Sequence, residues 1–135
     1  MEYFSTRNTR DKITASQAIV NGLASDGGLY VPETFPAVGP EELSRLCGMD
    51  YRGRAAQIIG KYLAEYTKDE VAAIVKAAYG INYDDPLIAP TRFTDEDTGF
   101  LELWHGPTSA FKDMALQMLP HLMTSSLKKC GETRG

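Results

Sequence analysis

The strongest constraint on the fold is an amphipathic stretch between Arg52 and Tyr66. Apolar side chains recur there at the three- and four-residue spacing of a helix, while Arg54, Lys61 and Glu65 fall on the opposite side. The apolar positions are Ala55, Ile58, Ile59, Tyr62, Leu63 and Tyr66. This period predicts a helix that buries one face in a core.

Two further helices are predicted by capping boxes. In this motif a Thr side chain accepts a hydrogen bond from a backbone N–H three residues later, and a Gln or Glu at that later position reaches back. Thr14 and Gln17 make one such pair, and Thr67 and Glu70 make the other. Apolar residues follow both pairs at helical spacing, so a helix is expected to begin after each threonine.

The rest of the first half predicts one more helix and a short strand. Between Gly39 and Gly48, a proline and two glutamates stand where a helix start favours them. Residues 29–31 are typical of a short strand, because they follow a turn-forming Ser-Asp-Gly-Gly run and precede a proline. We therefore expect residues 1–82 to form a mainly helical amino-terminal domain with a few short strands.

The character of the chain changes after residue 82. A proline-containing connection leads to two strand-like segments, residues 91–93 and 100–104, with an acidic turn at residues 95–99 between them. The second segment runs through a Gly-Pro turn into another helical pattern. The fold class that follows is α/β, with residues 83–135 as the start of a second domain built on a strand and a helix.

Composition narrows the possible functions. The chain has 135 residues and a formal net charge of -4, which argues against binding nucleic acid. No apolar run approaches the roughly 20 residues that cross a bilayer, so no membrane partner is expected. The first ten residues lack the apolar core of a secretory signal, which favours a cytoplasmic location. Cys47 and Cys130 have no metal-ligand spacing, so two reduced thiols and no metal site are expected.

Lys112 is the residue that stability alone does not explain. The expected strand ends at Trp104, Gly106 and Pro107 force a sharp exit, and Thr108 or Ser109 is placed to cap the next helix. Lys112 then falls in the first turn, where a cation opposes the helix dipole. It is also in register with the apolar positions Leu116, Leu119, Met123 and Leu127.

A lysine in such a place suits covalent chemistry with an aldehyde. The amine must lose its proton to attack, and its ordinary pKa is about 10.4. Desolvation and the positive end of a helix both disfavour the ammonium form. The residues alone leave two alternatives open for Lys112: a Schiff-base lysine, or a lysine whose stem covers apolar surface while its amine stays in water.

Two segments resemble the threonine synthase family. Residues 101–113, Leu-Glu-Leu-Trp-His-Gly-Pro-Thr-Ser-Ala-Phe-Lys-Asp, are similar to that family's cofactor-lysine segment, and residues 3–7 and 18–33 resemble its amino-terminal domain. The resemblance implies a pyridoxal 5'-phosphate enzyme of the tryptophan-synthase-β-like fold. It also implies conversion of O-phospho-L-homoserine and water to L-threonine and phosphate.

The resemblance assigns Lys112 as the catalytic and cofactor-binding residue, which holds pyridoxal phosphate as a Schiff base and later moves protons on the substrate. His105, Thr108, Ser109 and Asp113 are weaker candidates for contacts with cofactor or substrate. Each has an equally good structural explanation, such as fixing the corner or capping the helix. His121, which follows a proline, is given no role.

Members of this family are several times longer than this chain. Their loop for the cofactor phosphate follows the point where this sequence stops, so the chain is expected to be a truncated piece that is inactive alone. The remainder of the same polypeptide is then expected to complete the active site. Two alternatives stay open: a threonine-synthase-like phospholyase, and a non-catalytic helical interaction module in which Lys112 only covers apolar surface.

Overall fold

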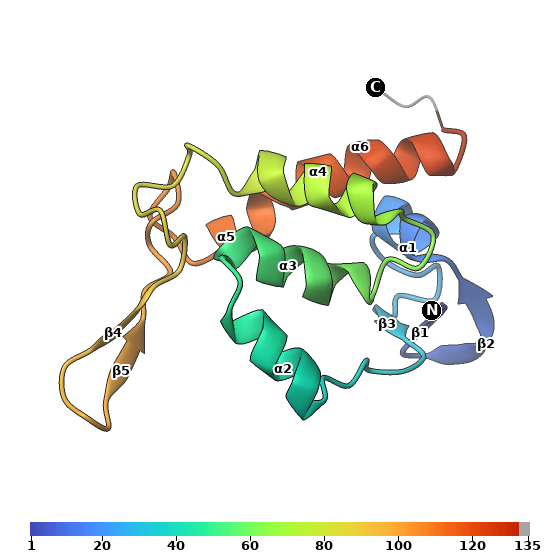
Figure 1. The fold of residues 1–135 in the computed structure, drawn as a ribbon. Helices are drawn as coiled ribbons and strands as arrows, with labels where there is room; N and C mark the ends of the chain where they lie inside the picture. The colour runs from blue at the N-terminus through green and yellow to red at the C-terminus, as the bar shows by residue number, and fades with distance from the viewer. Residues whose placement is uncertain (133–135) are drawn as a thin grey trace.

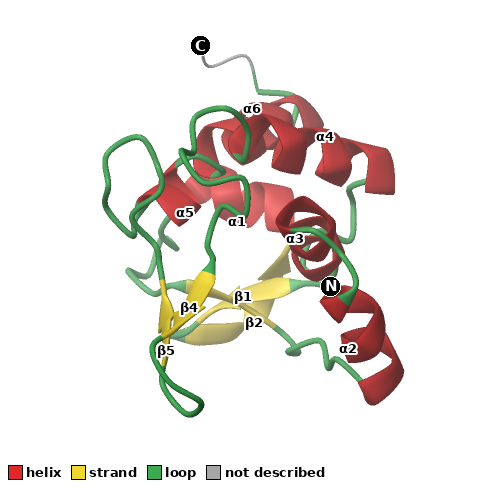
Figure 2. Cartoon of the chain, turned by 60° about the vertical axis from the view of Figure 1, so that its left-hand side comes forward, coloured by secondary structure: helices red, strands yellow, loops and turns green. Residues whose placement is uncertain are grey.

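Most helices lie between a three-stranded sheet at one end of the molecule and a two-stranded hairpin at the other, as Figure 1 shows, and Figure 2 shows the strands below most of the helices. The computed structural model describes residues 1–132. The helices are α1 (Ala15–Asn21), α2 (Pro40–Cys47), α3 (Tyr51–Gly60), α4 (Lys68–Ala78), α5 (Asp113–Leu116) and α6 (Leu119–Lys129). The strands are β1 (Tyr3–Ser5), β2 (Asn8–Ile13), β3 (Tyr30–Pro32), β4 (Thr91–Phe93) and β5 (Gly99–Leu101). This mixed α/β arrangement agrees with the expected fold class.

The two predicted capping boxes are both present. At the start of α1, Thr14 Oγ1 accepts from the backbone N–H of Gln17 at 3.2 Å, and Gln17 Oε1 accepts from the N–H of Thr14 at 3.0 Å. At the start of α4, Thr67 and Glu70 make the same pair of bonds at 3.2 and 2.7 Å. These reciprocal bonds satisfy backbone donors that a helix start leaves free.

The amphipathic helix is shorter than its apolar stripe predicts. α3 starts at Tyr51, where the Asp50 carboxylate accepts from the Gly53 N–H at 2.8 Å, and it ends at Gly60. Glycine is a poor helix former, and the chain tightens there into bonds between residues three apart. Leu63 and Tyr66 are still buried, but turns rather than a helix bring them into the core.

The sequence did not predict the strands β1 and β2. β1 pairs antiparallel with both β2 and β3, in the order β2-β1-β3. The β2 sequence is almost entirely polar and four of its six residues are exposed, so it lacks the alternation that marks a half-buried strand. The Tyr3 hydroxyl donates to the Tyr62 carbonyl at 2.8 Å, which ties the sheet to the segment after α3.

One core connects the amino-terminal elements to the last helix. α4 and α6 lie side by side over α3 and α1 (Figure 1). Buried residues of α1, α4 and the connecting segments form a continuous cluster, and partly buried side chains of α3 and α6 pack against it. The cluster contains Ala15, Leu63, Tyr66, Val71, Ile74, Val75, Ala78, Tyr79, Tyr83, Ile88 and Met118. It crosses the expected boundary at residue 82. The division into residues 1–82 and 83–135 stays a prediction, and residues 133–135 lie outside the described part.

The second half differs from expectation at two points. The strand expected over residues 100–104 ends at Leu101, where β5 pairs with β4 in a hairpin that projects from one end of the molecule (Figure 1). The helix expected after Lys112, which Pro120 was expected to kink, is broken between α5 and α6. Pro120 stands in the first turn of α6, where a missing N–H costs nothing, so it starts a new helix.

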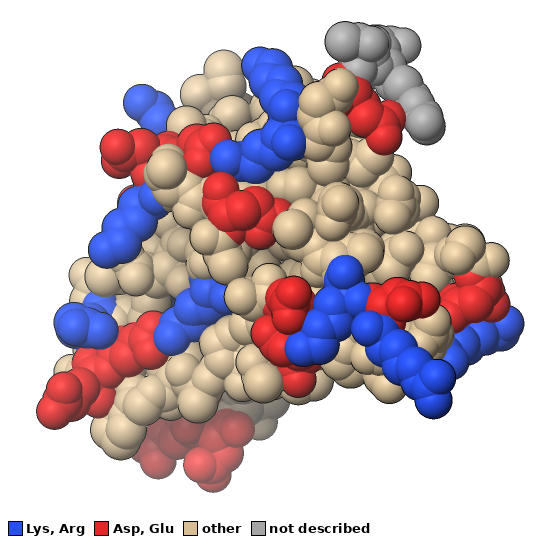
Figure 3. Space-filling view, turned by 90° about the vertical axis from the view of Figure 1, so that its right-hand side faces the viewer, with Lys and Arg blue, Asp and Glu red and all other residues tan. Residues whose placement is uncertain are grey.

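Charges of both signs alternate on the face that carries the amino-terminal sheet (Figure 3). Lys12 pairs with Glu2 at 3.2 Å and with Glu33 at 2.9 Å, and Lys61 pairs with Glu42 at 2.8 Å. These ion pairs are at least partly exposed, so each contributes little to stability. Over residues 1–132, no helix is long and apolar enough to span a bilayer.

Candidate functional site

Lys112 stands at the end of a tight loop that leads into α5. The Ser109 N–H donates to the Gly106 carbonyl at 3.0 Å, and Ser109 has a left-handed φ of 57°. Lys112 itself has helical backbone angles and immediately precedes Asp113, the first residue of α5. Because α5 ends at Leu116 and a new helix follows, Lys112 does not share one helix with Leu119, which corrects the register expected from the sequence.

The Lys112 side chain is exposed. Within residues 1–132, its amine makes no hydrogen bond and no ion pair. The described residues therefore do not supply the desolvation that the sequence argument assumed. They do leave a primary amine free of any carboxylate or carbonyl that would compete with an aldehyde for it. This chemistry fits covalent attachment of a carbonyl compound such as pyridoxal phosphate.

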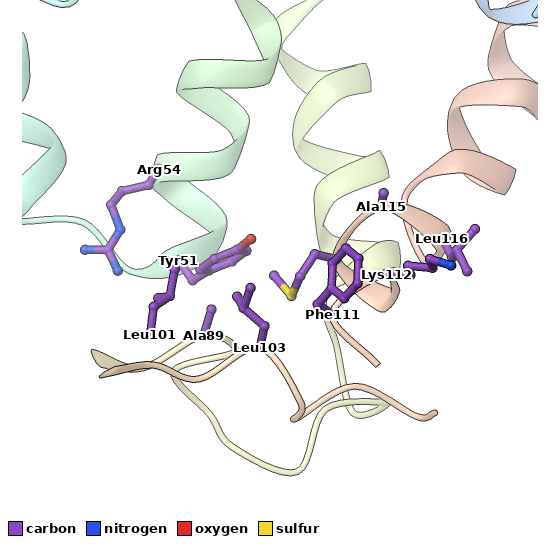
Figure 4. A pocket seen from close by; sticks show the side chains of 10 residues that line it. Tyr51, Arg54, Ala89, Leu101, Leu103, Phe111, Lys112, Ala115 and Leu116 are labelled. Carbon is purple, nitrogen blue, oxygen red and sulfur yellow. The ribbon is translucent and has the colours of Figure 1, made fainter. Parts of the chain in front are cut away.

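Lys112 borders an open, mainly apolar cavity of about 630 Å³ between the start of α3 and the segment that follows β5. Its wall includes Tyr51, Leu101, Leu103, Phe111 and Met114. Figure 4 shows Lys112 and Leu116 at one end and Arg54 at the other. The volume lies in the ordinary range for small-molecule sites. Phe111 is 65% exposed, so part of this wall faces outward.

His105 is held between two carboxylates. Its Nδ1 lies 2.6 Å from Asp84 Oδ1, and its Nε2 lies 2.8 Å from Glu102 Oε2. Both ring nitrogens must donate to make these contacts, which requires the protonated ring. Hydrogen bonds to Glu102 and then to Asp84 raise the pKa of His105 above its ordinary value. His105 thus fixes the corner after β5, and both its nitrogens are already engaged.

Arg92 extends this cluster to the loop before β4. Its guanidinium lies 2.9 Å from Asp85 and 3.7 Å from Glu102. The Asp84 N–H also donates to the His105 carbonyl at 3.0 Å. Sequence reasoning missed this cluster. A usable signal was present, because an Asp-Asp pair and a Glu-x-x-His spacing flank the two expected strands.

Asp113 is the most buried of the expected site residues, at 1% exposure. Its Oδ2 accepts from the Thr108 N–H at 2.8 Å and from Thr108 Oγ1 at 2.9 Å. No side chain caps α5, so the expectation that Thr108 or Ser109 caps this helix is wrong. Instead, the side chain of the first helical residue, Asp113, accepts hydrogen bonds from the loop before the helix. His121 is exposed and, within residues 1–132, makes no polar contact.

Two tyrosine hydroxyls hold the start of α5 from the core side. Tyr83 donates to the Asp113 carbonyl at 3.1 Å, and Tyr79 donates to the Met114 carbonyl at 2.7 Å. Burial raises the pKa of Tyr83 to about 12 and also raises the pKa of Tyr79, so both hydroxyls keep their protons at neutral pH. Nothing in the sequence around these tyrosines signals this contact.

Both cysteines are free thiols, as expected. Cys47 is exposed and Cys130 is partly buried. Within the described residues, no three His, Cys, Asp or Glu side chains come together in a group that fits a metal ion.

Comparison with known proteins points to one family. The family model described as threonine synthase N terminus matches residues 2–79. The chain is 37% identical to threonine synthase of Methylobacillus glycogenes, over 98% of this chain and 30% of that protein. It is 40% identical to mouse threonine synthase-like 1, over 79% of this chain and 15% of that protein.

A solved structure agrees with these matches. The crystal structure of pyridoxal-phosphate-bound threonine synthase from Brucella melitensis superposes with a TM-score of 0.90 at 36% identity. That match covers 98% of this chain and 28% of the Brucella chain. The chain therefore spans less than a third of the length of the relatives that it matches.

Proposed function

The chain belongs to the threonine synthase family, and from that premise we propose that it is the amino-terminal part of an enzyme that converts O-phospho-L-homoserine and water to L-threonine and phosphate. The observation that carries the proposal is the free amine of Lys112 beside an apolar cavity. The resemblance of residues 101–113 to the family's cofactor-lysine segment supports the same assignment.

The proposed cofactor is pyridoxal 5'-phosphate, attached covalently to Lys112. The structural relative from Brucella melitensis is described as bound to this cofactor. When bound, pyridoxal phosphate supplies an electron sink for the electrons of substrate bonds that break. Residues 101–113 present one reactive amine, and the groups that hold the cofactor phosphate and ring are assigned to the remainder of the protein.

Lys112 has two tasks in this proposal. Its amine first holds the cofactor, and once released it takes up and delivers protons at substrate carbons near the amino group. An arginine cannot replace it, because the guanidinium does not lose its proton. The bonds within the turn between His105 and Asp113 fix the backbone that carries this amine at the edge of the cavity.

The remainder of the polypeptide is the proposed partner that completes the site. Large apolar side chains beside Lys112 are exposed, including Phe111 at 65%, Leu101 at 58% and Leu116 at 51%. Burying such surface is favourable, which suits a face covered by a larger catalytic domain. We therefore propose that residues 83–135 begin that domain and that the chain alone is inactive. The cytoplasmic location stays a prediction.

A second candidate is a threonine-synthase-like phospholyase, which would remove phosphate from a related phosphoamino acid. The resemblance of residues 101–113 to the family's lysine segment allows it as well. The two reactions share the lysine segment and differ in their products, so analysis of the products of the full-length protein separates them.

Borohydride trapping tests the assignment of Lys112. The full-length protein is incubated with pyridoxal phosphate, reduced and digested, and the modified peptide is identified by mass spectrometry. We expect the adduct on Lys112, release of phosphate and threonine from O-phosphohomoserine, and loss of both in Lys112→Ala. Lys128→Ala is the matched control, because Lys128 is also exposed and without a polar partner within residues 1–132. An adduct mapped elsewhere, or none, would count against the proposal and favour a non-catalytic module.

A further inference from the structure

The carboxylate of Asp113 closes the loop that carries Lys112. Asp113 Oδ2 accepts two hydrogen bonds from Thr108, one from its backbone N–H and one from its hydroxyl. Both donors belong to the turn and the acceptor belongs to α5, so the bonds join the two ends of the segment 108–113. Hydrogen bonds to an ionised carboxylate are stronger than those between neutral groups. Lys112 is the last residue inside this closed loop.

The turn and the carboxylate are in close contact. A Cβ atom added at Gly106 would lie 2.5 Å from Asp113 Cβ and 2.7 Å from Asp113 Oδ2. Only glycine allows this approach, because real Cβ atoms do not come that close to another side chain. The carboxylate is thus enclosed between the Gly106 backbone and Thr108, which leaves the turn little room to shift relative to α5.

The backbone of Asp113 is fixed from the opposite side. The Tyr83 hydroxyl donates to the Asp113 carbonyl at 3.1 Å, and Tyr83 is 7% exposed. One residue therefore has its side chain bonded to the turn and its carbonyl bonded to the core. The peptide that joins Lys112 to Asp113 lies next to both anchors.

Burying the Asp113 carboxyl group costs free energy, because one of its oxygens has no hydrogen-bond partner within residues 1–132. Asp113 Oδ1 is buried and has no hydrogen-bond partner within residues 1–132, and no cation there pairs with the side chain. A buried carboxylate without a counter-charge is unfavourable compared with a neutral group of the same shape. An asparagine would fill nearly the same space without the charge. All the polar bonding of this buried side chain within residues 1–132 is thus directed to Thr108.

We propose that Asp113 is a positioning residue for the cofactor-binding lysine, and that its bonds to Thr108 hold the Lys112 backbone where the amine meets the cofactor. The inference rests on the proposed function of Lys112. It adds a role for two residues that do not themselves touch the cofactor.

The test uses the full-length protein with the variants Asp113→Asn and Thr108→Val. The readouts are the apparent dissociation constant for pyridoxal phosphate, followed by the visible absorbance of the lysine-linked cofactor, and the yield of borohydride-trapped adduct. Each variant weakens or removes a bond to a charged group, so we expect attachment to weaken by about tenfold to a hundredfold. Thr108→Ser keeps both donors and should recover wild-type attachment.

A matched control separates positioning from stability. Asp26→Asn weakens another carboxylate of the same kind, because Asp26 Oδ1 accepts from the Ser5 hydroxyl at 2.7 Å and from the Gly28 N–H at 2.8 Å, and Asp26 does not line the cavity beside Lys112. It should lower the melting temperature and leave cofactor attachment unchanged. If Asp113→Asn does not fold, Thr108→Val, which keeps the backbone donor and the side-chain shape, decides the question.

The outcomes also separate this inference from the proposed function. If the wild-type protein forms no adduct at Lys112, the proposed function fails, and the positioning role fails with it. If the wild type forms the adduct and folded Thr108→Val attaches the cofactor equally well, only the positioning role is overturned. Weakened attachment in Thr108→Val, recovered in Thr108→Ser, supports the positioning role.

Discussion

Replacing Ser126 with alanine tests the buried hydroxyl cluster that joins α6 to the rest of the core. Ser126 is 0% exposed, and its Oγ lies 2.6 Å from the hydroxyl of Tyr66. The other neighbour of that hydroxyl is Ser16 Oγ at 3.4 Å, which is a long contact. In Ser126→Ala the Tyr66 hydroxyl loses its short hydrogen-bond partner. Because the site is buried, water does not replace that partner.

The expected loss follows from this geometry. Leaving a buried hydroxyl without its partner costs about 1–3 kcal/mol. With a urea slope of roughly 2 kcal/mol per molar, a loss of about 2 kcal/mol lowers the midpoint of unfolding by about 1 M. Tyr66→Phe should cost a similar amount, because it leaves Ser126 Oγ unpaired in turn. The double variant should lose less than the sum, by about 0.5–3 kcal/mol of coupling.

The assay is equilibrium unfolding of the chain in urea, followed by circular dichroism. Ser125→Ala is the matched control, since Ser125 lies on the same helix, is less buried and makes no side-chain hydrogen bond within residues 1–132. Its midpoint should move little in either direction. A midpoint for Ser126→Ala within the range of the control would refute the reasoning, and so would single-variant losses that add fully in the double variant.

Three further outcomes are expected. Gly106→Ala should lower the free energy of unfolding by about 1–3 kcal/mol, since the new methyl group collides with Asp113. Gly39→Ala is the control and should lose less, because nothing lies within 4 Å of the added atom. Equal losses of stability in thermal unfolding of the two variants would contradict this. The pKa of His105 is raised in the folded protein, so its contribution to stability is complete below about pH 6.5 and is lost as the pH rises through the folded-state pKa. The urea midpoint of the wild type should therefore fall above pH 6.5, and His105→Gln should remove this fall. If the midpoint depends on pH in the same way in both proteins, the assignment of a protonated ring is wrong. Thr67→Ala should cost about 1 kcal/mol by loss of the cap of α4, and a midpoint unchanged in urea would speak against that cap.

Local sequence signals predicted where the helices begin. The elements that they did not predict depend on contacts between residues far apart in the sequence. The capping pairs at Thr14 and Thr67 lie within four residues, so the sequence alone locates both helix starts. β2 is stabilised by pairing with β1 across a turn and has no apolar face of its own, which left no periodic signal. Gly60 shows the limit of periodicity, because the apolar stripe continues after the helix has ended.

In the candidate site, too, the local features could be predicted from the sequence and the contacts between distant residues could not. The unusual position of Lys112 was visible in the sequence, and so was the sharp turn before it. The bonds that hold the turn were not. Asp113 was interpreted as an acid that favours a helix start, but its carboxylate points to Thr108 and is almost fully buried. The tyrosine at position 83 lies 30 residues before the carbonyl that it binds, a separation that no local pattern reports.

The core shared by α1, α4 and α6 has a consequence for the order in which the protein forms during synthesis. Its buried residues lie between Ala15 and Met118, so all of them are available once α6 has left the ribosome. Chains tend to fold from the amino terminus while translation continues. The turn that presents Lys112 lies inside this early-forming unit, between Ile88 and Met118 of its core. The loop that carries Lys112 can therefore form together with this core, and the proposed cofactor-binding lysine would be in position as soon as the core is complete.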